Sequence, residues 1–421
     1  MIKTIEIYPG VTLRCFGDTR FKQGCLSFQI LRPQRAEEVA MNALIPSVLL
    51  RGCENYPNLR AITDQLDELY GASIGTMVRR VGDYQATGLY CGFIEDRFAM
   101  EGDEILQPMV EFLGQLLLTP VLEDGGFCRS FVAGEKKNLI STIESELNDK
   151  RAYAMGKLLK TMCRADSFGV PRLGDKKNVA AIEAKPLYDH YCHILRTSPM
   201  NLFYVGSTPA EDVATMVRKM LKPIERNYES LPPQTAFADG GGSDTVEQMD
   251  VAQGKLCMGF VTDITNCSSK FAAMQVLNTI YGSGMISKLF VQVREKRSLC
   301  YDIGSGYYGS KGILTVSAGI DCTKEQQVRQ EILAQLEACC RGEITQEELD
   351  AAKESLISSL RGVHDSPGSI EGYYSTAALS GAPRSLAQYM DEIQTVRLED
   401  VTESAKDLKL HTTYFLRGAC I

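Results

Sequence analysis

The sequence repeats itself once, and this duplication limits the folds open to the chain more than any other feature. Segments of the first half recur in the same order in the second half, at an offset of roughly 210 to 230 residues, which exceeds the periods of solenoid repeats. The matched runs are 26–31 with 256–261, 72–75 with 301–304, 87–94 with 314–322, 137–141 with 354–358, and 201–206 with 413–418. Their common order and nearly constant offset predict two homologous domains.

Prolines and glycines mark the boundary between the two halves. Residues 231–233 read Leu-Pro-Pro and residues 239–244 read Asp-Gly-Gly-Gly-Ser-Asp, a composition typical of a linker. We therefore place an N-terminal domain at 1–228, a linker at 229–240 and a C-terminal domain at 241–421. Each half mixes strand-like alternation with longer helical patterns, and strands occur both in succession and between helices. This predicts an α+β fold and not a doubly wound sheet.

Composition excludes several classes of function. The net charge is -8 and no basic run or basic-aromatic patch occurs, so we expect no nucleic-acid partner. No stretch of 18 or more apolar residues occurs, so we expect no membrane span. The first residues lack the apolar core of a secretory signal. The 14 cysteines include no C-x-x-C pair, which indicates free thiols in a reducing compartment, and we expect a cytoplasmic protein.

Histidine is scarce, which limits the chemistry that the chain can perform. Its four histidines are His190, His193, His364 and His411, and neither H-E-x-x-H nor H-x-x-E-H is present. The sequence also lacks G-x-S-x-G and a P-loop. His190 and His193 could share one helix face, but a structural zinc site needs about four ligands and no second cluster is evident. We expect both to be partly exposed helix residues.

The most informative stretch is 281–303, which reads YGSGMISKLFVQVREKRSLCYDI. A glycine loop leads into an apolar helix, a charged turn and a strand. This order resembles the C-terminal-domain signature of the pitrilysin/insulinase-type zinc metallopeptidases. Thr119-Pro120, Ser167-Phe168-Gly169 with Gly174, and the strand before Gly206 follow the family's order and spacing, so the resemblance covers most of the chain. It implies two homologous domains of the LuxS/processing-peptidase type, each a mostly antiparallel sheet packed with helices, facing each other as a clam shell.

The resemblance also implies a zinc site that this sequence cannot form. Family members carry H-x-x-E-H on the first helix and a further ligand glutamate on a later helix. Aligned on these motifs, Ala43 and Ser47 take the histidine positions, Pro46 takes the general-base position and Thr142 takes the ligand-glutamate position. Alanine and proline offer no donor and serine is a poor zinc ligand, so we expect no metal in this chain. Pro46 also predicts a local rearrangement of the helix backbone.

A carboxylate beside the lost site is retained. Glu135 matches the family's auxiliary carboxylate. The alternative reading is an exposed acid in the first turn of a helix, favoured there by the helix dipole.

The other half of the family's site is retained. Arg294 and Tyr301 match the arginine and tyrosine that contact substrate near the scissile carbonyl, and Gly282 and Gly284 match the loop at the substrate cavity. A guanidinium and a phenol can both donate to a carbonyl or a developing oxyanion. In the alternative reading Arg294 pairs with a surface acid such as Glu295, Tyr301 packs within a strand, and the glycines form a turn that needs positive φ.

Three hypotheses follow. In the first, the chain is the non-catalytic subunit of a zinc-dependent peptidase heterodimer, as in the mitochondrial processing peptidase, and supplies Arg294 and Tyr301 to a paralogous partner that holds the zinc. In the second, it is a peptide-binding or scaffold protein of the same fold with no proteolytic role; a homodimer is also open. In the third, it is a self-contained peptidase with an unrecognised cysteine/histidine site.

Overall fold

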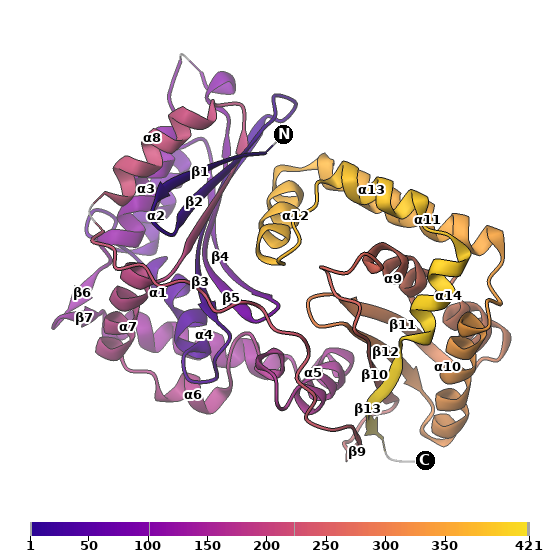
Figure 1. Cartoon of the computed structure of the whole chain (residues 1–421). Coiled ribbons are helices and arrows are strands. Elements are labelled where there is room, and N and C mark those ends of the chain that lie inside the picture. Colours follow the sequence, from indigo (N-terminus) through magenta and orange to yellow (C-terminus); the bar gives the residue numbers. More distant parts are fainter. Residues whose placement is uncertain (1, 101, 223, 419–421) are drawn as a thin grey trace. The chain divides into compact units, whose positions relative to one another are not determined.

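The computed structural model describes residues 2–100, 102–222 and 224–418, which form two compact units. The first unit contains Met1–Glu144, Pro171–Pro233 and His364–Thr376, and the second contains Ser145–Val170, Gln234–Val363 and Ala377–Ile421 (Figure 1). Neither unit is a continuous half of the sequence, because each includes one segment from the other half. Between the helix Ala210–Leu221 of the first unit and the strand Ser243–Gln248 of the second, the chain crosses from one unit to the other after Pro233, within residues 224–242, which form no helix or strand.

The first unit is built on a six-stranded sheet. Its strands are β1 (Ile2–Tyr8), β2 (Val11–Gly17), β3 (Gln23–Pro33), β4 (Ser73–Val81), β5 (Tyr84–Ile94) and β8 (Met200–Gly206), with a separate hairpin of β6 (Leu122–Glu123) and β7 (Gly126–Phe127). Its helices are η1 (Asp96–Phe98), α1 (Val39–Leu49), α2 (Leu59–Glu68), α3 (Leu106–Leu118), α4 (Arg129–Ser145), α6 (Lys176–Ala181), α7 (Ala184–Thr197), α8 (Ala210–Leu221) and most of α12 (Pro367–Leu379).

The second unit is built on a five-stranded sheet. Its strands are β9 (Ser243–Gln248), β10 (Gly254–Val261), β11 (Cys300–Tyr308), β12 (Ile313–Ile320) and β13 (Lys409–Arg417). Its helices are α5 (Lys150–Met162), η2 (Ser167–Gly169), α9 (Phe271–Asn278), η3 (Thr279–Ser283), η4 (Leu289–Lys296), η5 (Cys322–Lys324), α10 (Glu325–Cys340), α11 (Gln346–Gly362), α13 (Leu386–Thr395) and α14 (Leu398–Lys406), while η6 (Val363–Asp365) lies at the boundary between the units.

The two sheets share one topology, which confirms the predicted duplication. The first sheet has the order β1-β2-β8-β3-β5-β4, and the second has the order β11-β12-β10-β13-β9. Read from β4 and from β11, the strands correspond one to one, with β1 as the extra strand. Among the described strands, each sheet has one parallel pair, β2 with β8 in the first and β9 with β13 in the second. The prediction of an α+β fold with two mostly antiparallel sheets is therefore confirmed.

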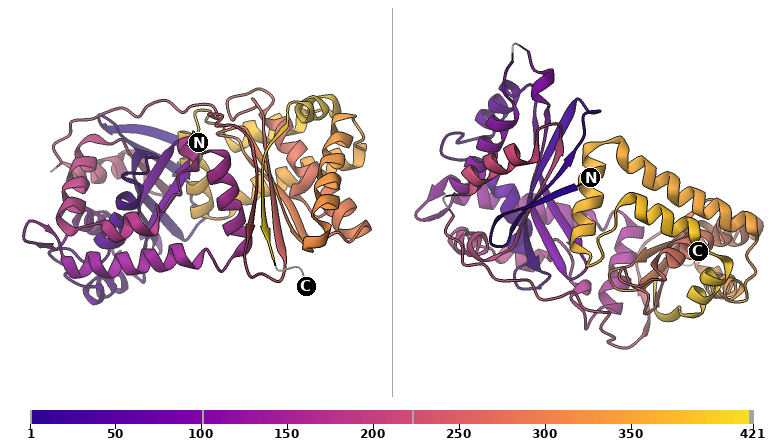
Figure 2. Two further views of the ribbon diagram at one scale, coloured as in Figure 1. Left: turned by 90° about the horizontal axis from the view of Figure 1, so that it is seen from below. Right: turned by 45° about the horizontal axis from the view of Figure 1, so that its top comes forward.

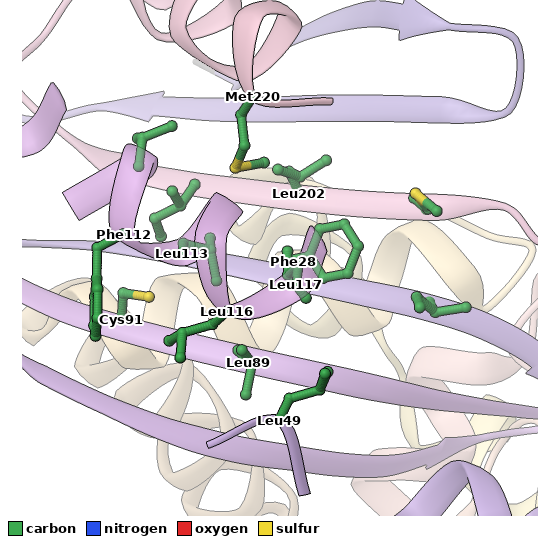
Figure 3. Close-up of a cluster of buried hydrophobic side chains, with 14 of the residues drawn as sticks. Phe28, Leu49, Leu89, Cys91, Phe112, Leu113, Leu116, Leu117, Leu202 and Met220 are labelled. Carbon is green, nitrogen blue, oxygen red and sulfur yellow. The ribbon is translucent and has the colours of Figure 1, made fainter. Parts of the chain in front are cut away.

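Alternation along the central strands separates the two faces of each sheet. In β3, Leu26, Phe28 and Ile30 enter the main core of the first unit, while Ser27 and Gln29 point to the other face. Figure 3 shows Phe28, Leu89 and Leu202 gathered with Phe112, Leu113, Leu116 and Leu117 of α3. Each large apolar side chain buried in this way contributes about 1.5–3 kcal/mol. The same alternation in β10 sends Leu256, Met258 and Phe260 into the core of the second unit.

The opposite face of each sheet is covered by one helix that comes from the other half of the sequence. In the second unit this helix is α5, which packs through Ala154 and Leu158 on Cys257 of β10 and on Tyr414 and Leu416 of β13. Figure 2 (left) shows the second sheet edge-on, with α5 in magenta on one side and orange helices on the other.

In the first unit this helix is α12, and it is anchored by a buried carboxylate. Glu371 is fully buried and accepts hydrogen bonds from Ser27 Oγ (2.8 Å), Gln29 Nε2 (3.0 Å) and Arg79 Nη2 (2.8 Å). Ile370 packs beside it on Cys25 and Phe203.

Among the described residues, no helix has both the length and the apolar character needed to cross a membrane.

Candidate functional site

The first helix carries three of the four positions where the zinc motif would lie. Ala43, Pro46 and Ser47 all lie on α1, with Ala43 and Pro46 buried and Ser47 half-buried. The helix continues unbroken from Val39 to Leu49, so the expected rearrangement of its backbone is wrong. Pro46 has no N–H, and the carbonyl of Asn42 therefore loses its usual partner within the helix. Burial of the apolar face of α1 in the core offsets this loss.

The fourth position lies on α4. The Thr142 hydroxyl donates to the carbonyl oxygen of Asn138, one turn earlier, at 2.9 Å. At the four positions, the only side-chain atoms that could bind a metal ion are thus the hydroxyl oxygens of Ser47 and Thr142, and neither is a usual zinc ligand. The residues present do not fit a zinc ion. Within the described ranges there is also no cluster of three or more His, Cys, Asp or Glu side chains that could hold a metal ion.

Glu135 is held by neighbouring side chains. Arg51 Nη1 lies 3.4 Å from its Oε1, Asn138 Nδ2 donates to its Oε2 at 3.1 Å, and its side chain is 11% exposed. Since α4 begins at Arg129, Glu135 lies beyond the first turn and is largely buried. The alternative reading as an exposed first-turn acid is therefore wrong.

A buried polar network that the sequence did not predict lies next to the lost zinc positions. Asn42 of α1 donates through Nδ2 to Gln85 Oε1 (2.9 Å), and its Oδ1 lies 2.7 Å from Nε2 of His190 on α7. Because Oδ1 can only accept, Nε2 of His190 carries the proton. Gln85 in turn donates to the carbonyls of Val39 and Arg172. Burial, helped by the nearby charge of Arg32, lowers the pKa of His190 to about 4, so the ring is neutral near pH 7.

The histidine contacts give no support to a cysteine/histidine nucleophile. His190 contacts Asn42, and His411 contacts Thr412 and Asp239. Burial raises the pKa of Cys25 and of Cys257 to about 12, which keeps both thiols protonated and unreactive.

The glycine loop of the second unit begins within one π-helical segment, η3, which contains Gly282, and leads from Gly284 to a second, η4. π-helical segments are rare in proteins, and those that do occur are often found at functional sites. Gly282 is buried, and a Cβ added there would come within 2.7 Å of both Leu289 Cδ1 and Ser305 Oγ. Gly284 has φ -130°, and a Cβ added there would make only an ordinary contact, 3.9 Å from the carbonyl oxygen of Thr279. Neither glycine has positive φ, so the alternative reading of a turn that needs positive φ is wrong.

Two apolar side chains of this loop point into solvent. Met285 is 79% exposed and Ile286 is 62% exposed. Together with Thr279, Glu348 and residues of α11 they line a pocket of about 310 Å³. Exposed apolar side chains around a hollow are typical of surfaces that bind a peptide or protein.

Arg294 and Tyr301 are both exposed and available for contacts. The guanidinium of Arg294 stacks on the ring of Phe290 at 4.5 Å, and no described carboxylate pairs with it. Tyr301 is 79% exposed, and its hydroxyl forms no hydrogen bond within the part of the chain that the structure describes. The alternative readings, a surface ion pair for Arg294 and strand packing for Tyr301, are therefore wrong.

A β-bulge explains the exposure of Tyr301. Cys300 pairs with Ile320 and Asp302 pairs with Gly319, so Tyr301 is an extra residue in the edge strand β11. Bulges often lie beside active sites, where they redirect a side chain. The turn between η4 and β11 contains Ser298 in the left-handed conformation (φ 52°), and its N–H donates to the carbonyl of Arg294 at 3.1 Å. Arg294 and Tyr301 thus flank a single ordered turn.

Comparisons with known proteins agree with this geometry. Residues 181–356 match the family profile described as "Peptidase M16 inactive domain". This range contains the glycine loop, Arg294 and Tyr301, but none of the four degenerate zinc positions. The chain is 28% identical over 411 residues to the probable inactive metalloprotease YmfF of Bacillus subtilis, a match that covers 98% of this chain and 96% of that protein.

The chain is a homologue of the inactive M16 peptidases. A conserved protein from Enterococcus faecalis has the same fold, with a TM-score of 0.93 and 25% identity over 100% of this chain and 99% of that one. An M16 inactive domain from Pseudomonas fluorescens superposes with a TM-score of 0.82 at 17% identity, covering 99% and 98% of the two chains. The resemblance to the pitrilysin/insulinase-type family, which is the M16 family, is thus confirmed. The absence of the zinc motif from this homologue agrees with a non-catalytic role.

Proposed function

We propose that this chain is the non-catalytic subunit of a zinc-dependent peptidase heterodimer. In this proposal it binds a peptide segment and supplies Arg294 and Tyr301 to the active site of a paralogous subunit that carries H-x-x-E-H and the zinc ion. The expected cytoplasmic location belongs to the proposal as well, and the free thiols described above support a reducing compartment.

The observation that carries the proposal is the exposure of Arg294 and Tyr301 on either side of one ordered turn. Both side chains are exposed and lack polar partners among the described residues, and the guanidinium of Arg294 stacks on the ring of Phe290, so the donors of both groups are free to bind a substrate. The bulge at Tyr301 and the strained Ser298 are local costs without an evident gain in stability. A guanidinium and a phenol on one ordered turn suit a developing oxyanion, which would lie near the partner's zinc.

Reconstitution with a zinc-bearing paralogue tests the proposal. Alone, the purified chain should bind no stoichiometric zinc and cleave no peptide. Mixed with an H-x-x-E-H paralogue, it should raise kcat/KM for peptide cleavage. Arg294→Ala should then lower kcat/KM by about 100-fold, the range found when one oxyanion donor is removed. Tyr301→Phe should lower it about tenfold, because only the hydroxyl is lost.

Arg297→Ala is the matched control, since it removes an arginine three residues away that is already paired with Glu331 (3.2 Å). Full activity of the Arg294→Ala mixture would contradict the role of Arg294. If the chain binds peptide but no paralogue gains activity from it, the alternative of a peptide-binding or scaffold protein without a proteolytic role gains support.

A further inference from the structure

A second pocket of the second unit, outside the glycine loop, contains a cationic side chain that the proposed function does not use. We call it the Arg151 pocket. Its volume is about 330 Å³, at the lower end of the range of small-ligand sites. Its lining residues come from the start of α5 and from the neighbouring strands β11 and β12, and they are Asp149, Arg151, Ala152, Met155, Gly304, Ser305, Gly306, Tyr308, Thr315 and Ser317.

The strand register explains why a hollow exists there. Gly304 pairs with Ser317 and Gly306 pairs with Thr315, so these four residues share the face of the sheet on which α5 lies. The helix packs on β10 and β13 through Ala154 and Leu158, toward the opposite edge from β11. The two glycines place no side chain in the remaining space, and the floor carries the hydroxyls of Thr315 and Ser317.

Arg151 is oriented but keeps unused donors. Its Nε donates to Ser317 Oγ at 3.1 Å, and its Nη1 lies 3.8 Å from Asp302 Oδ2, beyond hydrogen-bond distance. Neither terminal nitrogen has a hydrogen-bond acceptor among the described residues. The side chain is 54% exposed. A guanidinium held at Nε with free Nη atoms is suited to bidentate binding of a carboxylate.

The charges around the pocket favour the binding of an anion. Asp302 also pairs with Lys255 Nζ at 3.5 Å, so two cations share this one carboxylate. Asp149 faces the start of α5, and its Oδ1 accepts the N–H groups of Arg151 and Ala152. These N–H groups offset the charge of Asp149 locally.

We propose that the Arg151 pocket binds a carboxylate of the bound peptide, either an Asp or Glu side chain or the C-terminal carboxylate. This inference rests on the proposed peptide binding and gives it a substrate class. The pocket adjoins the glycine loop at Gly304, because a Cβ added there would lie 3.4 Å from the carbonyl oxygen of Gly282 and 3.6 Å from Nη2 of Arg151. A segment lying along the loop can therefore place an acidic group beside Arg151.

Peptide binding to the purified full chain, measured by fluorescence anisotropy, tests this proposal. The probes are three dye-labelled ten-residue peptides of alanine and serine. The first is amidated and has one central glutamate, the second is amidated with glutamine in its place, and the third has glutamine and a free C-terminal carboxylate. We expect the first or the third to bind about tenfold more tightly than the second, because a charge-assisted hydrogen bond contributes roughly this factor. The comparison identifies the source of the carboxylate.

Arg151→Gln should remove the preference, and Arg151→Lys should keep part of it, because lysine retains the charge without the planar fork. Lys160→Gln is the matched control on α5, an exposed site outside the pocket with the same change of charge. Equal binding of all three peptides, unchanged by Arg151→Gln, would overturn the carboxylate pocket and leave peptide binding intact. Failure of every peptide to bind would overturn both proposals. If Arg151→Gln lowers the unfolding midpoint, two other measurements test the pocket. The Arg151→Lys variant should keep part of the preference for the carboxylate peptide, and the wild type should lose this preference as the salt concentration rises from about 0.1 to 0.3 M, as expected for a contact between charges.

Discussion

At the scale of single residues, the helix that would carry the zinc ligands is held in place by polar contacts. Asn42 lies beside the lost position Ala43, and its amide joins α1 to Gln85 of the sheet and to His190 of α7. Each partner is satisfied, so the network contributes stability and also fixes the orientation of the helix. The network thus ties α1 to the sheet and to α7 without any metal ion.

His190 makes this network sensitive to pH. Its pKa is about 4 in the folded protein and 6.5 in an unfolded chain, because burial disfavours the charged ring. Above pH 6.5 both states are neutral and the stability is fully present; between pH 6.5 and 4 only the unfolded state takes up the proton. The free energy of unfolding should thus fall as the pH drops through this window, by at most about 3 kcal/mol.

The measurement is urea unfolding of the wild type and of His190→Gln at pH 7.5, 6 and 4.5. Glutamine keeps a donor for Asn42 and does not titrate. As the pH falls, the free energy of unfolding of the wild type should decrease more than that of the variant. Identical pH profiles for the two proteins would contradict the assignment.

At the scale of elements, the segment η3–loop–η4 combines tight packing on one side with exposure on the other. Gly282 lies against Leu289 and Ser305, whereas a side chain at Gly284 would meet nothing closer than the carbonyl oxygen of Thr279, at 3.9 Å. The sequence resemblance assigns both glycines to one role. The structure shows that packing alone explains the first of them, because any side chain there would collide with buried neighbours.

A matched pair of variants separates packing from binding. Gly282→Ala should lower the free energy of unfolding by about 1–3 kcal/mol, since Leu289 and Ser305 must move to admit the methyl group. Gly284→Ala should leave stability within about 0.5 kcal/mol, because φ is -130° and no atom lies within 3.4 Å of the added carbon. Chemical denaturation measures both. Equal destabilisation by the two substitutions would show that the loop is packed differently.

The duplication and the α+β mixture of strands and helices could be predicted from the sequence, because alternation and repeat order are local patterns. The bulge at Tyr301 could not, since it depends on how β11 pairs with β12. The Asn42 network was missed because a single asparagine within an apolar helix gives no signal of its partners. Arg151 was missed because its pocket depends on two glycines in a strand distant in sequence.

At the scale of the whole molecule, each compact unit depends on a segment from the other half of the chain. Residues of Ser145–Val170 belong to the second unit, and His364–Thr376 belong to the first. An amphipathic pattern shows that a helix buries one face, but it does not show which sheet covers that face. This is why the sequence led us to propose continuous domains at 1–228 and 241–421, which remain a proposal about homology and do not coincide with the compact units.

The exchange of segments makes a final prediction about folding. The isolated fragment 1–228 would lack α12, exposing the apolar face around Phe16, Cys25 and Phe203. The isolated fragment 241–421 would lack α5, exposing the apolar face around Cys257, Tyr414 and Leu416. At about 1.5–3 kcal/mol for each large side chain uncovered, the loss approaches the whole stability of a domain of about 5–15 kcal/mol. Neither fragment should unfold cooperatively alone, as followed by circular dichroism, and both should bind a hydrophobic dye.

Co-expressed, the two fragments should purify as a one-to-one complex with a cooperative unfolding transition, because the missing segments are then present. A separate fragment that unfolds as sharply as the full chain would show that the exchanged helices are dispensable, and the units would then be independent domains.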